Sequence, residues 1–226
     1  MAHVHSLLPL SRSDLEFIWL LTAGWDDADL RSTRSTTKRL FLLDTVGDPL
    51  DRLALQLGAQ AAGFQLLDVP RDLDAAGVLA TVGPLADAIA VVDDSGRYDA
   101  LYEQGDVPVL TVRRNGGGPL EVLAHLYRWY MAGQPLRGLR VVWRGRSEAT
   151  LTAWCEATRQ VPLQVTHVGE RDLVSPALLE ELRRGAQQGE FRRLRTAPDH
   201  DVDATPRADV RTLACTIAAV LEFTQP

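Results

Sequence analysis

Short apolar segments that alternate with helical patterns restrict the fold of this chain more than any other feature. Segments with the length and content of buried strands lie at 40–43, 64–69, 88–92, 107–112, 139–143 and 163–168. Apolar residues at helical spacing fill the intervals, as in 49–62 and 119–132. Strands that are apolar along their whole length are typical of parallel sheets covered by helices on both faces. The sequence therefore predicts an α/β protein with parallel sheets, in which the second α/β unit is the smaller.

Both ends of the chain are predicted to be helical. Ser13 caps an opening helix, and Gly24 is expected to end it. The apolar segment 210–223 predicts a closing helix. Before it, residues 175–182 form a further predicted helix, and residues 196–206 have the polar composition of a loop.

The charge balance and the cysteines limit the classes of partner and compartment. With 24 Lys plus Arg against 30 Asp plus Glu, the net charge of −6 argues against nonspecific attraction to nucleic acid or to anionic membranes. No segment reaches the length of a transmembrane helix. Cys155 and Cys215 lie within apolar helical patterns, which favours buried, reduced thiols and a cytoplasmic location.

Motifs for a cofactor or a metal are not found in the sequence. Gly116-Gly117-Gly118 precedes a helix, but it has neither the G-x-G-x-x-G order of a dinucleotide site nor the lysine of a P-loop. A flexible connection is the favoured interpretation of this glycine run. His3 and His5 alternate as metal ligands do, yet a frayed terminus explains them more simply. We expect no resident metal and no cofactor.

Five segments in the same order resemble the aspartate/ornithine carbamoyltransferase family, closer to its ornithine branch. They are DAI at 87–89, VPV at 107–109, LRGLRV at 136–141, DLVSPALL at 172–179 and TIAAVL at 216–221. The resemblance implies a carbamoyl-phosphate domain over residues 1–132, a reduced amino-acid domain over 133–209, and a terminal helix over 210–226 that returns to the first domain. It also implies a cleft between the domains and assembly as a homotrimer through the first domain.

The phosphate-binding motifs of that family are degenerate in this chain. In the family, S-T-R-T-R at a helix start, an arginine after the third strand and H-P-x-Q hold the phosphate and the carbamoyl oxygen. The first motif aligns with residues 48–52, where only its final arginine is kept, as Arg52. The position of the arginine after the third strand is occupied by Val92. H-P-x-Q falls on 118–121 and keeps only its proline. A similar sequence, STRST at 32–36, precedes the first strand and therefore lies at the wrong end of it.

The amino-acid motifs are missing as well. After the first strand of its second domain the family carries an Asn-rich loop, where this chain has RSEAT at 146–150. The S-M-G and H-C-L-P motifs are found nowhere in the sequence, and the stretch before the last helix is too short to hold them. The resemblance therefore implies that a block of the amino-acid domain has been deleted.

The acids that replace the expected hydroxyl and cationic groups define a candidate site. Unit charges about 4 Å apart interact by roughly 4 kcal/mol at an effective dielectric near 20, so carbamoyl phosphate is not expected to bind. The ligand-binding candidates are Asp48, Asp51, Arg52, Asp93, Arg113, Glu121 and Arg146, and the catalytic candidates are Asp51, Glu121 and His125. The simpler interpretation makes the acids turn residues, helix caps and solvated side chains. In the alternative they line a pocket for an amine, a guanidinium or a metal cation.

Three hypotheses about function come from this pattern. The favoured one is a carbamoyltransferase-like protein without carbamoyl transfer, which acts as a binding, regulatory or scaffold subunit, as a homotrimer or beside an active paralogue. The second is a repurposed biosynthetic enzyme that acts on a cationic, amino-acid-like small molecule in the cleft between the domains. The third, least favoured, is a residual carbamoyltransferase that uses Arg52, Arg113 and Arg114.

Overall fold

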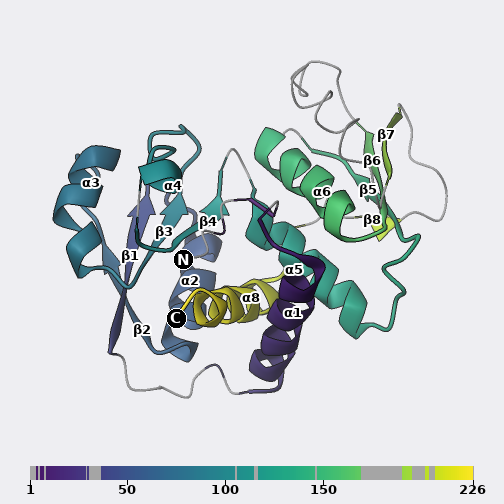
Figure 1. Ribbon diagram of the computed structural model, residues 1–226, viewed down its shortest axis with the longest axis horizontal. Helices are drawn as coiled ribbons and strands as arrows, with labels where there is room; N and C mark the ends of the chain where they lie inside the picture. The colour runs from purple at the N-terminus through teal and green to yellow at the C-terminus, as the bar shows by residue number, and fades with distance from the viewer. Residues whose placement is uncertain are drawn as a thin grey trace.

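Two parallel β-sheets flanked by helices form the molecule, as the strand and helix patterns predicted (Figure 1). The computed structural model describes residues 4, 6–7, 9–28, 30, 37–104, 106–114, 117–145, 147–168 and 207–225, and for the backbone also 190–194 and 202–203. Each sheet has four strands, and all recorded strand pairs within the two sheets are parallel. The predicted α/β fold with two parallel sheets is therefore confirmed.

The first sheet has the strand order β2-β1-β3-β4. Its strands are β1 (Lys38–Asp44), β2 (Phe64–Asp68), β3 (Ala88–Val92) and β4 (Val109–Arg113). The helices α2 (Pro49–Ala61), α3 (Ala75–Thr81) and α4 (Leu101–Gln104) connect them, with a short 3-10 turn η1 (Gly83–Leu85) after α3. At the outer edge of β4, Val4 pairs in parallel with Leu110. The chain therefore adds β2 at one edge of β1 and then β3 at the opposite edge, so the strand order reverses direction between β1 and β3.

Alternating residues of the first sheet enter two separate cores, which explains why its strands are apolar throughout. Leu40 and Leu42 of β1 belong to a large core shared with α1, α2, α5 and α8. Leu43, together with Ile89 and Val91 of β3, belongs to a second core shared with α3 and α4. Successive side chains of a strand point to opposite faces, so both faces of this sheet are buried.

Besides α2, the helices α1, α5 and α8 pack on the large core. The helix α1 (Arg12–Asp27) begins with Ser11 as its N-cap rather than Ser13, and Asp14 completes a capping box. The expected stop at Gly24 is wrong, because the helix continues for another turn and buries Trp25. The other two helices are α5 (Pro119–Met131) and α8 (Val210–Phe223).

The last helix packs on the first unit although it follows the second sheet in sequence. α8 lies against α1 and α2, and nine of its residues, Leu213 through Leu221, are buried. Gly58 of α2 allows the closest approach, because a Cβ at this position would lie 2.6 Å from the carbonyl oxygen of Ala214 and 2.9 Å from Ile217. Arg207, three residues before the first residue of α8, is thereby brought to the start of α2.

The second sheet has the order β7-β6-β5-β8. It comprises β5 (Arg140–Trp143), β6 (Gln164–Val168), β7 (Glu190–Leu194) and β8 (Val202–Asp203), and α6 (Glu148–Gln160) connects β5 with β6. β7 was not predicted, and β8 lies within the segment assigned to a loop. Both are edge strands, and polar residues dominate β7, so neither has the apolar signature of a central strand. The helix predicted over 175–182 lies outside the described residues.

Two further sequence expectations concern burial and membrane insertion. Cys155 and Cys215 are both buried and form no disulfide, as their apolar contexts predicted. Within the described part of the chain, no helix combines the length and the apolar character needed to cross a bilayer.

Candidate functional site: an acid–arginine cluster

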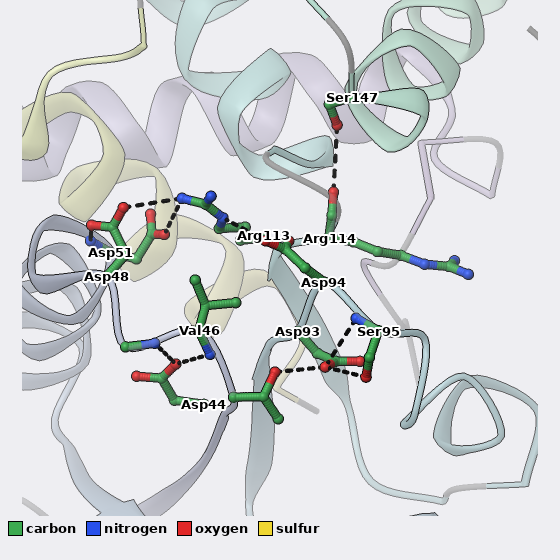
Figure 2. A network of polar contacts seen from close by, with 12 residues as sticks. Asp44, Val46, Asp48, Asp51, Asp93, Asp94, Ser95, Arg113, Arg114 and Ser147 are labelled. Atoms are coloured by element: carbon green, nitrogen blue, oxygen red, sulfur yellow. Dashed lines mark hydrogen bonds and ion pairs between the residues drawn. The ribbon is translucent and has the colours of Figure 1, made fainter. Parts of the chain in front are cut away.

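The carboxyl ends of β1 and β3 meet where the strand order of the first sheet reverses. Ligands of open parallel sheets bind in the crevice outside such a point. Here the two ends are joined, because the Thr45 amide donates to the carbonyl of Val92 at 3.0 Å and the Thr45 hydroxyl donates to Asp93 at 2.6 Å. The centre of the crevice is therefore occupied by the chain's own polar contacts (Figure 2).

Asp93 is a buried acceptor, with 2% of its surface exposed. Besides Thr45, its carboxylate accepts the hydroxyl of Ser95 at 2.7 Å, the amide of Ser95 at 3.2 Å and the amide of Arg97 at 3.0 Å. Burial by itself raises the pKa of Asp93, but these hydrogen bonds outweigh it and hold the pKa below its ordinary value. Asp93, which was predicted to bind a ligand, therefore uses both carboxylate oxygens for hydrogen bonds to Ser95 and Arg97 of its own loop.

The start of α2 presents two carboxylates where an anion would otherwise bind. Asp48 is the N-cap and accepts the backbone amides of Leu50 at 2.8 Å and Asp51 at 3.3 Å. Pro49 occupies the first helical turn, which is favourable because proline lacks an amide hydrogen. Asp51, one turn into the helix, is only 3% exposed. The free amides and the dipole of this helix terminus are therefore partly satisfied by internal acids.

Two arginines from distant parts of the chain neutralise these acids. Arg113, at the end of β4, donates to Asp48 at 3.0 Å and forms ion pairs with Asp51 at 3.5 Å and Asp94 at 3.6 Å. Figure 2 shows its side chain extended from β4 towards the two aspartates. Arg207 donates to Asp48 at 3.0 Å and also donates to Asp51. We call Asp48, Asp51, Asp94, Arg113 and Arg207 the acid–arginine cluster.

The cluster keeps Asp48 ionised. Burial raises the pKa of this carboxyl, but the amide of Leu50, the hydrogen bond from Arg207 and the charges of Arg207 and Arg113 together bring it below its ordinary value. With three carboxylates and two guanidinium groups, the cluster has a net charge of −1 when all are ionised. An added anion would gain no unpaired guanidinium from this arrangement.

Glu121 lies beside the cluster in the first turn of α5. Burial raises its pKa from 4.5 to about 7, although the backbone amide of Ala208 and the charge of Arg113 oppose the shift. The contact with Ala208 also ties α5 to the residue that follows Arg207. Glu121 and Arg207 therefore hold the segment before α8 from two sides, and Glu121 is the group of this site that titrates near neutral pH.

The loop before α5 closes against the second unit. Gly117 faces α6 so closely that a Cβ at this position would overlap the hydroxyl of Thr150 and lie 2.9 Å from Glu121. The hydroxyl of Ser147, the N-cap of α6, donates to the carbonyl oxygen of Arg114 at 3.4 Å. The glycine run predicted as a flexible connection thus contains a position of close approach between the β4–α5 loop and α6.

Arg52 and His125 take no part in the acid–arginine cluster. Arg52 forms a two-pronged pair with Asp68 at 2.7 and 2.8 Å, on an exposed surface of the first unit. His125 is buried between Trp129 and Trp154, with ring-centroid distances of 5.7 and 6.0 Å. Arg146 lies outside the described residues.

Arg114 also points away from the cluster. It pairs with Asp99 at 2.5 Å, and Figure 2 shows it directed opposite to Arg113. Neighbouring residues of a strand alternate in direction, so Arg113 and Arg114 cannot both face α2. Of the three arginines that a residual carbamoyltransferase would use, Arg52, Arg113 and Arg114, only Arg113 therefore belongs to the cluster.

Arg207 is the site residue that sequence reasoning missed. It comes two residues before Asp209, the N-cap of α8, and directly after a polar segment. No local pattern distinguishes it from the other arginines of the chain. Its role depends on the return of α8 to α2, which brings a residue 156 positions away into contact with Asp51.

Comparison with solved structures identifies the fold. Aspartate transcarbamoylase from Trypanosoma cruzi in its ligand-free form matches with a TM-score of 0.80 and 12% identity, over 99% of this chain and 96% of the other. Ornithine carbamoyltransferase from Burkholderia thailandensis matches with a TM-score of 0.73 and 15% identity, over 99% and 98%. The anabolic ornithine carbamoyltransferase from Campylobacter jejuni matches with 0.74 and 14%, over 87% and 68%.

These similarities define a carbamoyltransferase-like fold. Both aspartate and ornithine carbamoyltransferases share it with this chain, at identities of 12–15% in the three comparisons above. No protein-family model and no curated protein sequence matches the chain.

The chemistry open to the site follows from its charges. The acid–arginine cluster offers carboxylates that already bind guanidinium groups, and Glu121 offers a proton that exchanges near neutral pH. Among the described residues, no group of three or more His, Cys, Asp or Glu side chains has the arrangement of a metal site. Each carboxylate of the pair Asp48 and Asp51 is thus already bound to a guanidinium group, and both guanidinium groups of the cluster are bound to carboxylates.

Proposed function

We propose that this protein does not transfer carbamoyl groups and serves as a binding, regulatory or scaffold subunit built on a carbamoyltransferase-like fold. The observation that carries this proposal is the pairing of Asp48 and Asp51 with Arg113 and Arg207 at the N-terminus of α2. An anion that approached this helix would meet two carboxylates and no unpaired guanidinium within the cluster. Such a reversal of charge removes the electrostatic stabilisation on which phosphoryl-group binding depends.

Carbamoyl phosphate is expected to leave the protein unchanged. At low millimolar concentration it should not raise the midpoint of thermal unfolding, because only a ligand with affinity for the folded state stabilises it. Incubation with labelled carbamoyl phosphate and either ornithine or aspartate should give no carbamoylated amino acid above the enzyme-free rate. Stabilisation by carbamoyl phosphate, or product formation that Arg113→Gln abolishes, would contradict the proposal.

The assembly is part of the same proposal. The family resemblance favours a homotrimer or a complex with an active paralogue, in a cytoplasmic setting. Sedimentation equilibrium of the full chain, alone and mixed with a carbamoyltransferase from the same cell, distinguishes these two states from a monomer.

A second candidate function is a receptor or enzyme for a guanidinium or amine. Arg207 supports it, because its guanidinium group already binds Asp48 and Asp51 in the way that such a ligand would. It reaches them from the short segment before α8, so displacement of the side chain would expose the two acids. Glu121, with a pKa of about 7, is then the residue suited to accept or donate a proton.

Agmatine is expected to bind Arg207→Ala more tightly than the wild-type chain. The substitution leaves Asp51 buried with one ion-pair partner fewer, so the variant should be less stable, and a small guanidinium should restore part of that loss. We expect about a tenfold gain in affinity by isothermal titration calorimetry, on the scale of one charge-assisted hydrogen bond.

The matched control for this experiment is Arg211→Ala. Arg211 is an exposed arginine of α8 that pairs with Asp26 and takes no part in the cluster. It should show no gain in affinity for agmatine. Equal agmatine binding by wild type, Arg207→Ala and Arg211→Ala would exclude the acid pair as a guanidinium site.

A further inference from the structure

The carboxyl group of Glu121 lies where the two units of the molecule meet. α5 and α6 pack side by side at this point (Figure 1). Glu121 stands in the first turn of α5, and a Cβ added to Gly117 would lie 2.9 Å from its Oε2 atom and would overlap the hydroxyl of Thr150. Thr150 belongs to the first turn of α6. The carboxyl group of one unit and the first helical turn of the other therefore lie around the same glycine.

No ion pair of Glu121 is found within the part of the chain that the structure describes. The charge of Arg113 lowers its pKa, but burial outweighs this effect. The ionisable groups on the surrounding elements are Arg113 and Arg114 at the end of β4, Asp48 and Asp51 at the start of α2, Arg207 and Asp209 before α8, Glu148 of α6 and His125 of α5. The three arginines already bind other carboxylates, those of α2 and of Asp99. An ionised Glu121 is therefore left without a cation of its own among these groups.

The neighbours of Glu121 differ in what they offer to an ionised carboxylate. On one side the backbone amide of Ala208 donates a hydrogen bond to it, and this bond favours the charged form. On the other side the hydroxyl of Thr150 donates to Ser147 at 3.0 Å, and the hydroxyl of Ser147 donates to the carbonyl oxygen of Arg114 at 3.4 Å. Thr150 therefore keeps water from Glu121 without supplying a donor in its place.

We propose that the contact between the first turn of α6 and the β4–α5 loop is a pH-sensitive switch with Glu121 as its sensor. With the proton bound, Glu121 is neutral and the two units pack together at Gly117. When the proton passes to the solvent, α6 separates from the loop, water reaches the carboxylate, and the hydrogen bond from Ala208 remains. This switch is independent of the proposed function, because it needs no ligand at the acid–arginine cluster.

The direction of the pH dependence follows from the burial of Glu121. Its pKa is about 7 with the contact closed and 4.5 for a free glutamate, so the closed contact binds the proton more tightly than an open one. The contact is therefore at full strength below about pH 4.5 and weakens as the pH rises to about 7. The weakening is at most about 300-fold, which is the ratio of the two acid dissociation constants.

Gly117→Ala tests whether α6 is what keeps water from Glu121. The added methyl group overlaps Thr150 and should hold the two units apart at this contact, and Gly117 has no positive φ that alanine would strain. Titration of the Glu121 carboxyl carbon by NMR should give a pKa of about 7 in the wild type and a clearly lower value, towards 4.5, in the variant. The control is Gly24→Ala, whose added Cβ meets no atom within 4 Å. A pKa of Glu121 that stays at about 7 in Gly117→Ala would overturn the proposal.

Hydrogen exchange of single amides in the full chain tests the opening itself. At about pH 8.5 the amide of Thr150 should exchange about tenfold faster in the wild type than in Glu121→Gln, which stays closed because glutamine carries no charge. At about pH 5.5 this amide should exchange at the same rate in both proteins. Comparison at equal pH removes the pH dependence of the chemical exchange rate. The amide of Ala208 should exchange no faster in the wild type than in the variant, because it stays bonded to Glu121.

The matched control for the exchange experiment is Glu148→Gln, which removes an exposed glutamate from the same turn of α6 as Thr150. Thr150 should exchange in this variant as it does in the wild type. Equal rates for Thr150 in the wild type and in Glu121→Gln at about pH 8.5 would overturn the proposal. The same acceleration at Thr150, at Ala208 and in the central strands β1 and β3 would also overturn it, because that result would show a loss of global stability. If Gly117→Ala does not fold, the exchange experiment decides alone.

Discussion

Replacement of both Asp48 and Asp51 by serine is expected to turn the acid–arginine cluster into an oxyanion site. Serine keeps the N-cap of α2, since its hydroxyl also accepts a helix amide. Arg113 and Arg207 then lose their carboxylate partners at the helix N-terminus. Two guanidinium groups beside the positive end of a helix are an arrangement that binds phosphate. The double variant should therefore bind phosphate, which the wild-type chain is not expected to bind.

Stability and phosphate binding should change together in this variant. Loss of the buried partner Asp51 should lower the free energy of unfolding by about 3 kcal/mol. Inorganic phosphate at tenfold excess over its dissociation constant should restore roughly 1.4 kcal/mol, while the wild-type chain should not respond. The matched control is Asp68→Ser, which releases the exposed Arg52 instead. If phosphate does not stabilise the double variant, Asp48 and Asp51 are not the groups that prevent an anion from binding.

Glu121→Gln is expected to stabilise the protein above neutral pH and to have little effect in acid. The pKa of Glu121 is about 7 in the folded state against 4.5 for a free glutamate, chiefly because of burial. The folded chain therefore binds this proton more tightly than the unfolded chain. It follows that the free energy of unfolding falls as pH rises from about 4.5 to about 7 and is insensitive to this group on either side.

Denaturant unfolding of both proteins across that pH range measures the effect. Their difference in unfolding free energy should approach zero near pH 4 and reach at most roughly 3 kcal/mol near pH 8, in favour of the glutamine variant. Glu103→Gln, which changes an exposed glutamate of α4, should show no such pH dependence. A wild-type chain that is equally stable at pH 5 and pH 8 relative to Glu121→Gln would contradict the burial of this carboxyl.

The acids at the start of α2 combine two interpretations that the sequence left as alternatives. Asp48 is a helix cap, as the simpler interpretation holds, and it is also an ion-pair partner of Arg113 and Arg207. Asp51 is buried rather than solvated. Asp93 satisfies its own loop. Local sequence indicated where these acids stand on their strands and helices, but the arginines that pair with Asp48 and Asp51 come from other parts of the chain.

In the second sheet, apolar patterns in the sequence predicted the central strands but not the edge strands. β5 and β6 were predicted because central strands of a parallel sheet are apolar on both faces. β7 pairs with β6 along its full length, yet its sequence EFRRL holds three charged residues in five. Backbone hydrogen bonds to an existing neighbour define such an edge strand, and they leave little signature in its side chains.

Sequence alone determined the parallel α/β fold and the burial of the central strands. These properties depend on local periodicity and on residue type, which are visible in any stretch of the chain. Only the tertiary structure decided that Arg207 completes the acid–arginine cluster, that Arg52 and His125 lie outside it, and that Glu121 is buried enough to titrate near neutral pH. The contacts of Arg207 and Glu121 depend on the return of α8 to α2, whereas Arg52 is held by Asp68 and His125 by Trp129 and Trp154. In each case the partners come together only in the folded chain, where burial changes the pKa of a carboxyl group.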